Sequence, residues 1–212
     1  DRAQELTQKA VHIARDACQE LNSDAKIFGS VAPLEDCYDP DLAPDVHVCK
    51  QEHEKIIRHL VEADVDLILI ETMCEANEAI AAATVAKEHA PTWAISFCLS
   101  NHSVGKLLDG TSLTDIIPKL AGAQFIGINC VDATTLNQHV KHLRKLLPSN
   151  MPIAAYGNVG YANDENGWTN TDAVEPEQYA KYAMEWFESG ANIVGGCCGT
   201  TPESIQSIYT HQ

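Results

Sequence analysis

Apolar and polar positions alternate along the chain in two regular patterns. In the first segment, apolar residues recur every three or four positions (Leu6, Ala10, Ile13, Ala17), which is the spacing of one helix face. Six short apolar runs rich in β-branched residues follow, and each precedes another segment with helical spacing. The pattern predicts strands over 26–31, 65–70, 92–99, 124–129, 152–156 and 191–194. It predicts helices over 1–21, 48–63, 75–89, 113–120, 134–147, 175–189 and 202–209.

The predicted strands indicate a parallel sheet that is covered on both faces. Runs within 65–70 and 126–128 are almost continuously apolar, as the buried strands of parallel sheets are. The loops after the strands are longer and richer in polar residues and glycine than the loops before them. This arrangement predicts an α/β fold of the (β/α)8 TIM-barrel type, whose chemistry lies on the loops at the carboxyl ends of the strands.

The number of strands is smaller than a closed barrel requires. A (β/α)8 barrel has eight strands and typically about 250 residues, whereas six strands are predicted here, preceded by a helix with no strand before it. We therefore expect a single barrel domain over residues 1–212, N-terminally incomplete, from which the first strand–helix–strand is absent. An open doubly wound sheet is the alternative, although no G-x-G-x-x-G turn supports a dinucleotide-binding version of it.

Charge and cysteine content narrow the class of protein. The 212 residues carry 30 Asp and Glu against 14 Lys and Arg, which gives a net charge of −16. Such an acidic surface repels nucleic acid and anionic lipid, so we expect neither a nucleic-acid nor a membrane partner. Eight cysteines in a long chain with regular helices and strands favour a reducing compartment, the cytoplasm, over a disulfide framework. Four of the thiols are expected to be small buried apolar side chains: Cys18, Cys49, Cys74 and Cys98.

Three other cysteines stand apart because they follow predicted strands. Cys130 ends the motif Gly-Ile-Asn-Cys at 127–130, and Cys197 and Cys198 lie in Gly-Gly-Cys-Cys-Gly-Thr at 195–200. The carboxyl ends of barrel strands meet at one pocket, where three thiolates would make a tetrahedral zinc site with one open position. Spacing alone leaves other interpretations open. The Gly-Gly turn could bind phosphate or another anion, or it could be purely structural, with or without a vicinal disulfide.

The chain resembles the homocysteine S-methyltransferase family over roughly residues 26–208. The resemblance rests on Gly-Gly-Cys-Cys-Gly-Thr-Thr-Pro at 195–202 and Gly-Ile-Asn-Cys at 127–130, supported by segments at 71–73, 93–97, 109–113 and 156–158 and by Trp168. It implies a zinc-dependent (β/α)8 barrel that moves a methyl group to the sulfur of homocysteine. By the same resemblance, Cys130, Cys197 and Cys198 are the zinc ligands, and Glu71 holds the amino group of homocysteine. The Asp-Gly-Gly motif of the family's first strand does not occur here, in agreement with the absent strands.

The chemistry that this ligand set implies is nucleophilic. Zinc carries a charge of +2 and three cysteinates carry −3, so the centre is electron-rich and leaves a bound homocysteine thiolate able to attack a methyl donor. The expected donor is a small sulfonium, S-methylmethionine or S-adenosylmethionine, because the chain carries no folate- or cobalamin-binding module. Betaine is a further candidate, and the product would be methionine.

Other residues at predicted strand ends have two interpretations each. Ser96 and Asn129 either hydrogen-bond the substrate or support residues that do. Tyr156 and Trp168 either line a donor pocket or pack in the ordinary way. Two alternative functions also remain open: a barrel fragment that binds zinc or a thiol without turnover, and a phosphate-binding barrel lyase or isomerase.

Overall fold

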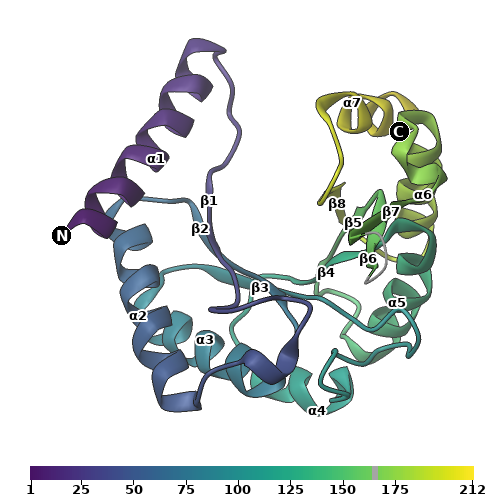
Figure 1. Ribbon diagram of the computed structural model, residues 1–212. Coiled ribbons are helices and arrows are strands. Elements are labelled where there is room, and N and C mark those ends of the chain that lie inside the picture. Colours follow the sequence, from purple (N-terminus) through teal and green to yellow (C-terminus); the bar gives the residue numbers. More distant parts are fainter. Residues whose placement is uncertain (164–166) are drawn as a thin grey trace.

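The computed structural model describes residues 1–163 and 167–212, which form a curved, parallel six-stranded sheet and its covering helices. The strands lie in the order β1-β2-β3-β4-β5-β8. Figure 1 shows the sheet as an open arc with the helices on its convex side. The sheet strands are β1 (Phe28–Val31), β2 (Leu67–Met73), β3 (Trp93–Phe97), β4 (Ile126–Asp132), β5 (Ile153–Asn158) and β8 (Ile193–Gly196).

Helices alternate with the strands of the sheet along the chain. They are α1 (Arg2–Glu20), α2 (Val46–Glu62), α3 (Ala76–His89), α4 (Leu113–Ile116), α5 (Ala133–Leu146), α6 (Pro176–Glu188) and α7 (Pro202–His211). Acidic residues at or after the strand ends begin several of them. Asp45 accepts a hydrogen bond from the His47 N–H at the start of α2, and Asp132 accepts one from the Thr134 N–H at the start of α5. Within the described part of the chain, no helix is both long and apolar enough to cross a bilayer.

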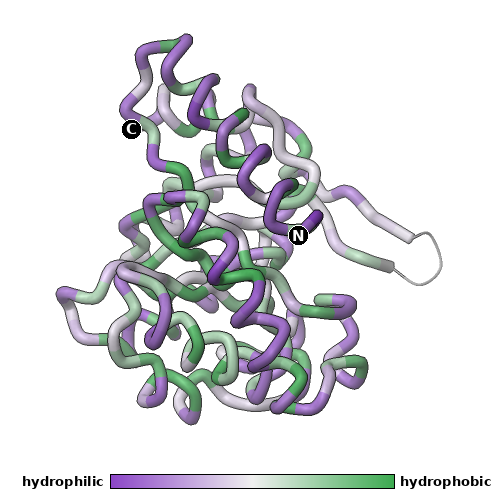
Figure 2. Tube along the Cα trace, turned by 90° about the vertical axis from the view of Figure 1, so that its left-hand side faces the viewer, coloured by the Kyte–Doolittle hydropathy of each residue, from purple (hydrophilic) through white to green (hydrophobic). Residues whose placement is uncertain are grey.

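The predicted elements are present, although several ends shift by a few residues and two regions differ in structure. The helix predicted over 113–120 is divided into α4 and a short 3-10 helix, Ile117–Lys119, because Pro118 has no N–H to continue the α-helical hydrogen bonds. The region 157–174, predicted as a loop, contains an antiparallel hairpin of β6 (Gly160–Asn163) and β7 (Gly167–Asn170), although positions 164–166 lie outside the described residues. Gly and Asn are depleted in strands, so this region has no periodic signal for a hairpin. Figure 2 shows the two strands projecting from the body of the molecule.

The sheet curls in one direction and is not a doubly wound sheet. A doubly wound sheet reverses its strand order and carries helices on both faces, whereas here the order is sequential and the helices lie on one face (Figure 1). Among the described residues, β1 pairs only with β2 and β8 only with β5, so the arc stays open between these two strands. The described residues thus form a curled half-barrel and not a closed eight-stranded one.

The two-residue period of the strands decides which side chains face the concave side. In β2, Ile68 and Ile70 belong to the large core beneath the helices, whereas Leu67 and Leu69 contribute to a small cluster on the opposite face. Glu71 continues the second series and therefore faces the concave side. The same period places one polar side chain from each of the next three strands on that face: Ser96, Asn129 and Tyr156.

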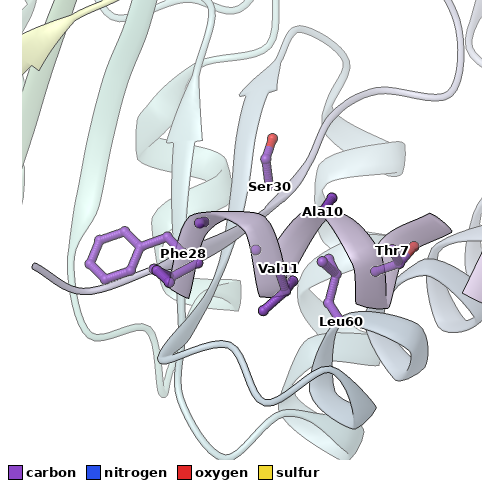
Figure 3. Close-up of a pocket in the computed structure, with 9 residues that line it drawn as sticks. Thr7, Ala10, Val11, Phe28, Ser30 and Leu60 are labelled. Carbon is purple, nitrogen blue, oxygen red and sulfur yellow. The ribbon is translucent and has the colours of Figure 1, made fainter. Parts of the chain in front are cut away.

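An apolar groove borders the free edge of β1. It has a volume of about 330 Å³ and lies between α1 and β1, lined in part by Val11, Phe28 and Leu60 (Figure 3). Leu6 and Ile13 on α1 are exposed to 56% and 61%. Exposed apolar side chains beside an unpaired strand edge are typical of a surface that another element covers.

Candidate metal centre

Three cysteine sulfurs converge at the carboxyl ends of β4 and β8. The Sγ of Cys130 lies 3.0 Å from that of Cys197 and 3.8 Å from that of Cys198, and all three lie within 4.8 Å of one another. In a tetrahedral zinc site with Zn–S bonds near 2.3 Å, neighbouring sulfurs are about 3.8 Å apart. The Cys130–Cys198 distance already has this value, and the shorter one needs to open by only about 0.8 Å. The three residues therefore fit a zinc ion.

A β-bulge aims Cys130 into this cluster. The pairing of β4 with β5 shifts register between Asn129 and Asp132, and Cys130 within the shift has a left-handed backbone with φ +54°. In β2 the register shifts between Ile70 and Met73, and Thr72 has φ +64°. Left-handed backbone is unfavourable for residues with a Cβ and concentrates at functional sites. The bulges also explain why β2 and β4 continue beyond their predicted ends.

A tight turn after β8 presents the other two sulfurs. The Cys197 N–H donates to the Gly157 carbonyl at 3.0 Å, and the Cys198 N–H donates to Asn158 Oδ1 at 3.0 Å, so β5 fixes both residues. The Thr200 N–H and hydroxyl both donate to the Cys197 carbonyl, which closes the turn. Because these three N–H groups already have acceptors in the protein, the turn is poorly suited to bind an anion. This argues against the phosphate interpretation.

The turn requires glycine at two positions. A Cβ on Gly196 would overlap the Thr200 side chain, and a Cβ on Gly199, which has φ +80°, would overlap Val159. We expect Gly199→Ala to lower the free energy of unfolding by about 1–2 kcal/mol for the left-handed backbone and by about 1–3 kcal/mol more for the overlap. Zinc affinity should fall as well, because Cys198 precedes this residue.

Gly110→Ala is the matched control for Gly199→Ala, and the stability of both variants is measured by urea unfolding. Gly110 has φ +85°, but a Cβ added to it would meet nothing within 4 Å, so only the backbone penalty applies. Equal losses of stability in the two variants would show that packing against Val159 does not hold the turn.

A buried hydrogen-bond network supports the sulfurs from below. The Asn129 side chain is fully buried, and its Oδ1 accepts from the Ser96 hydroxyl at 2.7 Å and from the Thr72 N–H at 3.0 Å. Its Nδ2 donates to Thr72 Oγ1 at 2.7 Å and to Cys197 Sγ at 3.9 Å. The network thus ties β2, β3 and β4 to a cysteine of the β8 turn. Asn129 contacts Cys197 directly, whereas Ser96 contacts Asn129.

Glu71 and Tyr156 form a second polar pair on the concave face. Both are half-buried, and the Tyr156 hydroxyl donates to Glu71 Oε2 at 3.0 Å. Burial, followed by the negative charge of Glu71, raises the pKa of Tyr156, so its hydroxyl stays protonated as a donor. The pair holds a carboxylate in a fixed place near the cysteines. Trp168, by contrast, lies on the hairpin, where its indole N–H donates to Asn170 Oδ1 at 2.7 Å.

The three thiols of the centre do not titrate alike. The hydrogen bond from Cys130, with a smaller contribution from the Asn129 amide, lowers the pKa of Cys197 to about 6 against the effect of burial. The same contact with Cys197, together with burial, raises the pKa of Cys130. Cys197 is therefore the first thiolate of the set, and a cation that neutralises it would favour deprotonation of the other two.

All eight cysteines are free thiols. Besides the three of the centre, two others lie beneath it. Cys74 and Cys98 are buried and pack with Cys130, and the Cys98 thiol lies 3.7 Å from the Cys130 carbonyl oxygen. The expectation of burial is confirmed for these two and for Cys49, but it is wrong for Cys18, which is half-exposed because α1 buries little besides Val11. Cys197 and Cys198 are both free thiols, so they form no vicinal disulfide.

Two residues of the site were not predicted from the sequence. The Asn158 side chain is buried beneath Cys198, and its Nδ2 donates to the Tyr38 hydroxyl at 3.2 Å. Tyr38 comes from the loop between β1 and α2, 120 residues away. The motif Tyr-Gly-Asn at 156–158 contained a signal for Asn158, whereas the polar sequence around Tyr38 contained none.

Comparisons with known proteins identify a family. The family model of homocysteine S-methyltransferase matches residues 1–211. Homocysteine S-methyltransferase 2 of Zea mays is 31% identical over 168 residues, covering 76% of this chain and 48% of its own. Homocysteine S-methyltransferase of Escherichia coli is 31% identical over 221 residues, covering 96% of this chain and 70% of its own.

Solved structures show the same architecture. The metallated form of the Escherichia coli homocysteine methyltransferase MmuM has a TM-score of 0.82 and 26% identity, covering 99% of this chain and 71% of that one. Its oxidized form has the same TM-score and 28% identity. The chain spans about half the length of the plant relatives it matches. With the family model matched over nearly its whole length, the chain belongs to the homocysteine S-methyltransferase family.

Proposed function

We propose that this protein is a zinc-dependent homocysteine S-methyltransferase that makes methionine. The observation that carries the proposal is the meeting of Cys130, Cys197 and Cys198 within 4.8 Å at the carboxyl ends of the strands, in a chain of this family. Three thiolates hold zinc and leave a fourth position for a substrate sulfur. Zinc bound there would keep the homocysteine thiol deprotonated at neutral pH.

The remaining steps depend on residues of the chain itself. The Glu71 carboxylate, held by Tyr156, binds the ammonium group of homocysteine and thereby directs its side chain toward the cysteines. The substrate thiolate then displaces the neutral leaving group of the methyl donor, and correct alignment of sulfur and methyl supplies much of the acceleration. Ser96 and Asn129 were predicted either to bind the substrate or to support residues that do. Ser96 donates to Asn129, and Asn129 binds Thr72, so their contacts support the second role.

The methyl donor is proposed to be a small sulfonium, S-methylmethionine or S-adenosylmethionine. A cationic donor is attracted by an electron-rich centre and by a chain with a net charge of −16. Betaine, which carries a quaternary ammonium, fits the same electrostatics less well because its carboxylate adds a negative charge.

The half-barrel is proposed to be the larger part of a (β/α)8 barrel within one domain. Two further strands would pair with the free edges of β8 and β1 and cover the groove beside Phe28. We also propose a reducing compartment, the cytoplasm, since a site of three thiolates must stay reduced to bind metal. Mass spectrometry of the intact gene product tests the proposed barrel. A product no longer than this chain would leave the edges of β1 and β8 unpaired and would contradict the proposal.

Methyl transfer is tested directly on the full-length protein. It is incubated with zinc, homocysteine and each donor in turn, and methionine is measured by mass spectrometry. Methionine formed from a sulfonium supports the proposal. Zinc uptake without methionine from any donor would favour the non-catalytic thiol-binding alternative, and no zinc uptake would overturn both.

Glu71→Gln tests the substrate contact. Loss of the negative charge should raise the KM for homocysteine about tenfold to a hundredfold, because a charge-assisted hydrogen bond contributes roughly 1.5–3 kcal/mol. The zinc content should stay unchanged, since Glu71 does not belong to the cysteine cluster. Glu88→Gln, at a side chain 64% exposed on α3, is the control. An unchanged KM in the Glu71 variant would remove this residue from the substrate site.

A further inference from the structure

Thr72 has a backbone conformation that a β-branched residue rarely adopts. It lies in the bulge of β2, has φ +64° and is 8% exposed. A left-handed backbone is a genuine outlier for a residue with a branched Cβ. Strain of this kind persists only where the surrounding structure holds it, and it concentrates at active sites. The contacts of Thr72 therefore bear on what the site does.

The Asn129 side chain holds Thr72 at two atoms. Its Oδ1 accepts a hydrogen bond from the Thr72 N–H at 3.0 Å, and its Nδ2 donates to Thr72 Oγ1 at 2.7 Å. The backbone N–H can only donate, so it fixes which atom of the amide is the oxygen. The Thr72 hydroxyl oxygen is then the acceptor in the second bond, and its own hydrogen remains for another acceptor.

That acceptor is the sulfur of Cys130. Thr72 Oγ1 lies 3.9 Å from Cys130 Sγ, and hydrogen bonds to sulfur are longer than those to oxygen because the sulfur atom is larger. β3 lies between β2 and β4 (Figure 1), so the backbones of these two strands are about 10 Å apart. The bulges of β2 and β4 shorten this gap, since Cys130 is also left-handed, with φ +54°. The two strained residues thus meet across β3.

The same pair of residues also donates to Cys197. Asn129 Nδ2 carries two hydrogens, of which one goes to Thr72 Oγ1 and the other to Cys197 Sγ at 3.9 Å. Thr72 and Asn129 are both buried. Together they supply one hydrogen to each of two sulfurs of the centre, from the interior of the protein.

Such hydrogen bonds bear on which sulfur is methylated. A methyltransferase with several metal-bound thiolates must methylate only the substrate sulfur. Methyl transfer to Cys130 would form an S–CH3 bond as the C–S bond of a sulfonium breaks, release the donor as a neutral thioether, and turn a charged zinc ligand into a neutral one. A hydrogen bond to a thiolate is charge-assisted and withdraws electron density from the sulfur, which makes the sulfur a weaker nucleophile.

We propose that Thr72 is a positioning residue whose hydroxyl donates to Cys130 Sγ and thereby protects this zinc ligand from methylation. The inference rests on the proposed function, since it requires zinc-bound thiolates and an alkylating substrate. The left-handed backbone of Thr72 is the means by which the hydroxyl reaches the sulfur from β2. A serine at this position keeps the donor, whereas valine and alanine remove it.

The test is the methylation of the zinc-loaded full-length protein by iodomethane without homocysteine, in which a thiolate displaces iodide. Tandem mass spectrometry follows each cysteine separately. Thr72→Val replaces the hydroxyl with a methyl group of similar size. It should raise the methylation rate of Cys130 at least about tenfold, the value of one hydrogen bond to a charged group, with less than about a twofold change at Cys198. Thr72→Ala should give the same rise, and Thr72→Ser should keep the wild-type rate.

Thr84→Val is the matched control. The Thr84 hydroxyl donates to the Ile80 carbonyl at 2.7 Å within α3, so its removal deletes a threonine hydrogen bond that involves no cysteine. The methylation rate of Cys130 should stay at the wild-type value in this variant.

Three results would overturn the inference. One is an unchanged Cys130 rate with zinc bound in Thr72→Val or Thr72→Ala, which would show that the hydroxyl does not protect the sulfur. Another is an equal rise at all three cysteines, which would show a loosened site. The third is a Thr72→Ser protein that reacts as fast as Thr72→Val. A wild-type protein that binds no zinc would instead overturn the proposed function, and the inference with it, so metal content separates the two failures.

Discussion

Replacing Cys197 with serine is expected to lower zinc affinity by about a hundredfold to a thousandfold. Structural zinc sites with four ligands bind with about 10–16 kcal/mol, so the loss of one thiolate removes about a quarter of this. Cys197 is the strongest candidate because it contacts Cys130 at 3.0 Å and has its pKa lowered to about 6 by that contact. A competition titration with a chromophoric chelator measures the change, and methionine formation should be lost in parallel.

Cys18→Ser is the matched control for this experiment. Cys18 is half-exposed on α1 and belongs to no metal-binding group of the described residues. Zinc affinity should therefore stay at the wild-type value. If Cys18→Ser and Cys197→Ser bound zinc equally well, the metal would have to lie elsewhere in the protein, and the proposed chemistry at β4 and β8 would be wrong.

Asn129→Ala is expected to lower the free energy of unfolding by about 2–4 kcal/mol. The substitution leaves the Thr72 N–H and the Ser96 hydroxyl without their acceptor in a fully buried place, and each unsatisfied group costs about 1–3 kcal/mol. Zinc affinity should also fall about tenfold to a hundredfold, as it does when residues that orient metal ligands are removed. Urea unfolding and zinc titration measure the two effects.

Asn137→Ala provides the comparison for stability. Asn137 also uses its whole amide, donating to Glu185 at 3.1 Å and accepting from Ser189 at 2.6 Å, but these contacts lie at the surface of α5 and α6. Water can replace them, so the expected loss is below about 1 kcal/mol. Losses of similar size in the two variants would mean that the buried network does not hold the bulges of β2 and β4.

The periodicity of the sequence predicts much of this structure because the two faces of each strand require different side chains. Ile68 and Ile70 must pack beneath helices, and Glu71 could be assigned to the carboxyl end of its strand from the apolar run before it. Since parallel strand ends share one edge, Cys130 and the pair at 197–198 could be predicted to meet. The barrel-like curl also followed from the strict alternation of strands and helices.

Features that depend on long-range contacts could not be predicted. The left-handed backbones of Thr72 and Cys130 contradict local preference, and Thr72 is held by Asn129 of β4, which lies beyond β3 in the sheet. The contact of Tyr38 with Asn158 joins a polar loop to β5 across 120 residues. No local pattern encodes either arrangement, because each exists only after the sheet has curled.

X-ray absorption at the zinc K edge, recorded as homocysteine is added to the zinc-loaded protein, tests the central claim most directly. We expect three sulfur neighbours at about 2.3 Å without substrate and four with it, as Cys130, Cys197 and Cys198 are joined by the homocysteine sulfur. A zinc ion bound only by nitrogen and oxygen, or a sulfur number that does not rise with homocysteine, would contradict it.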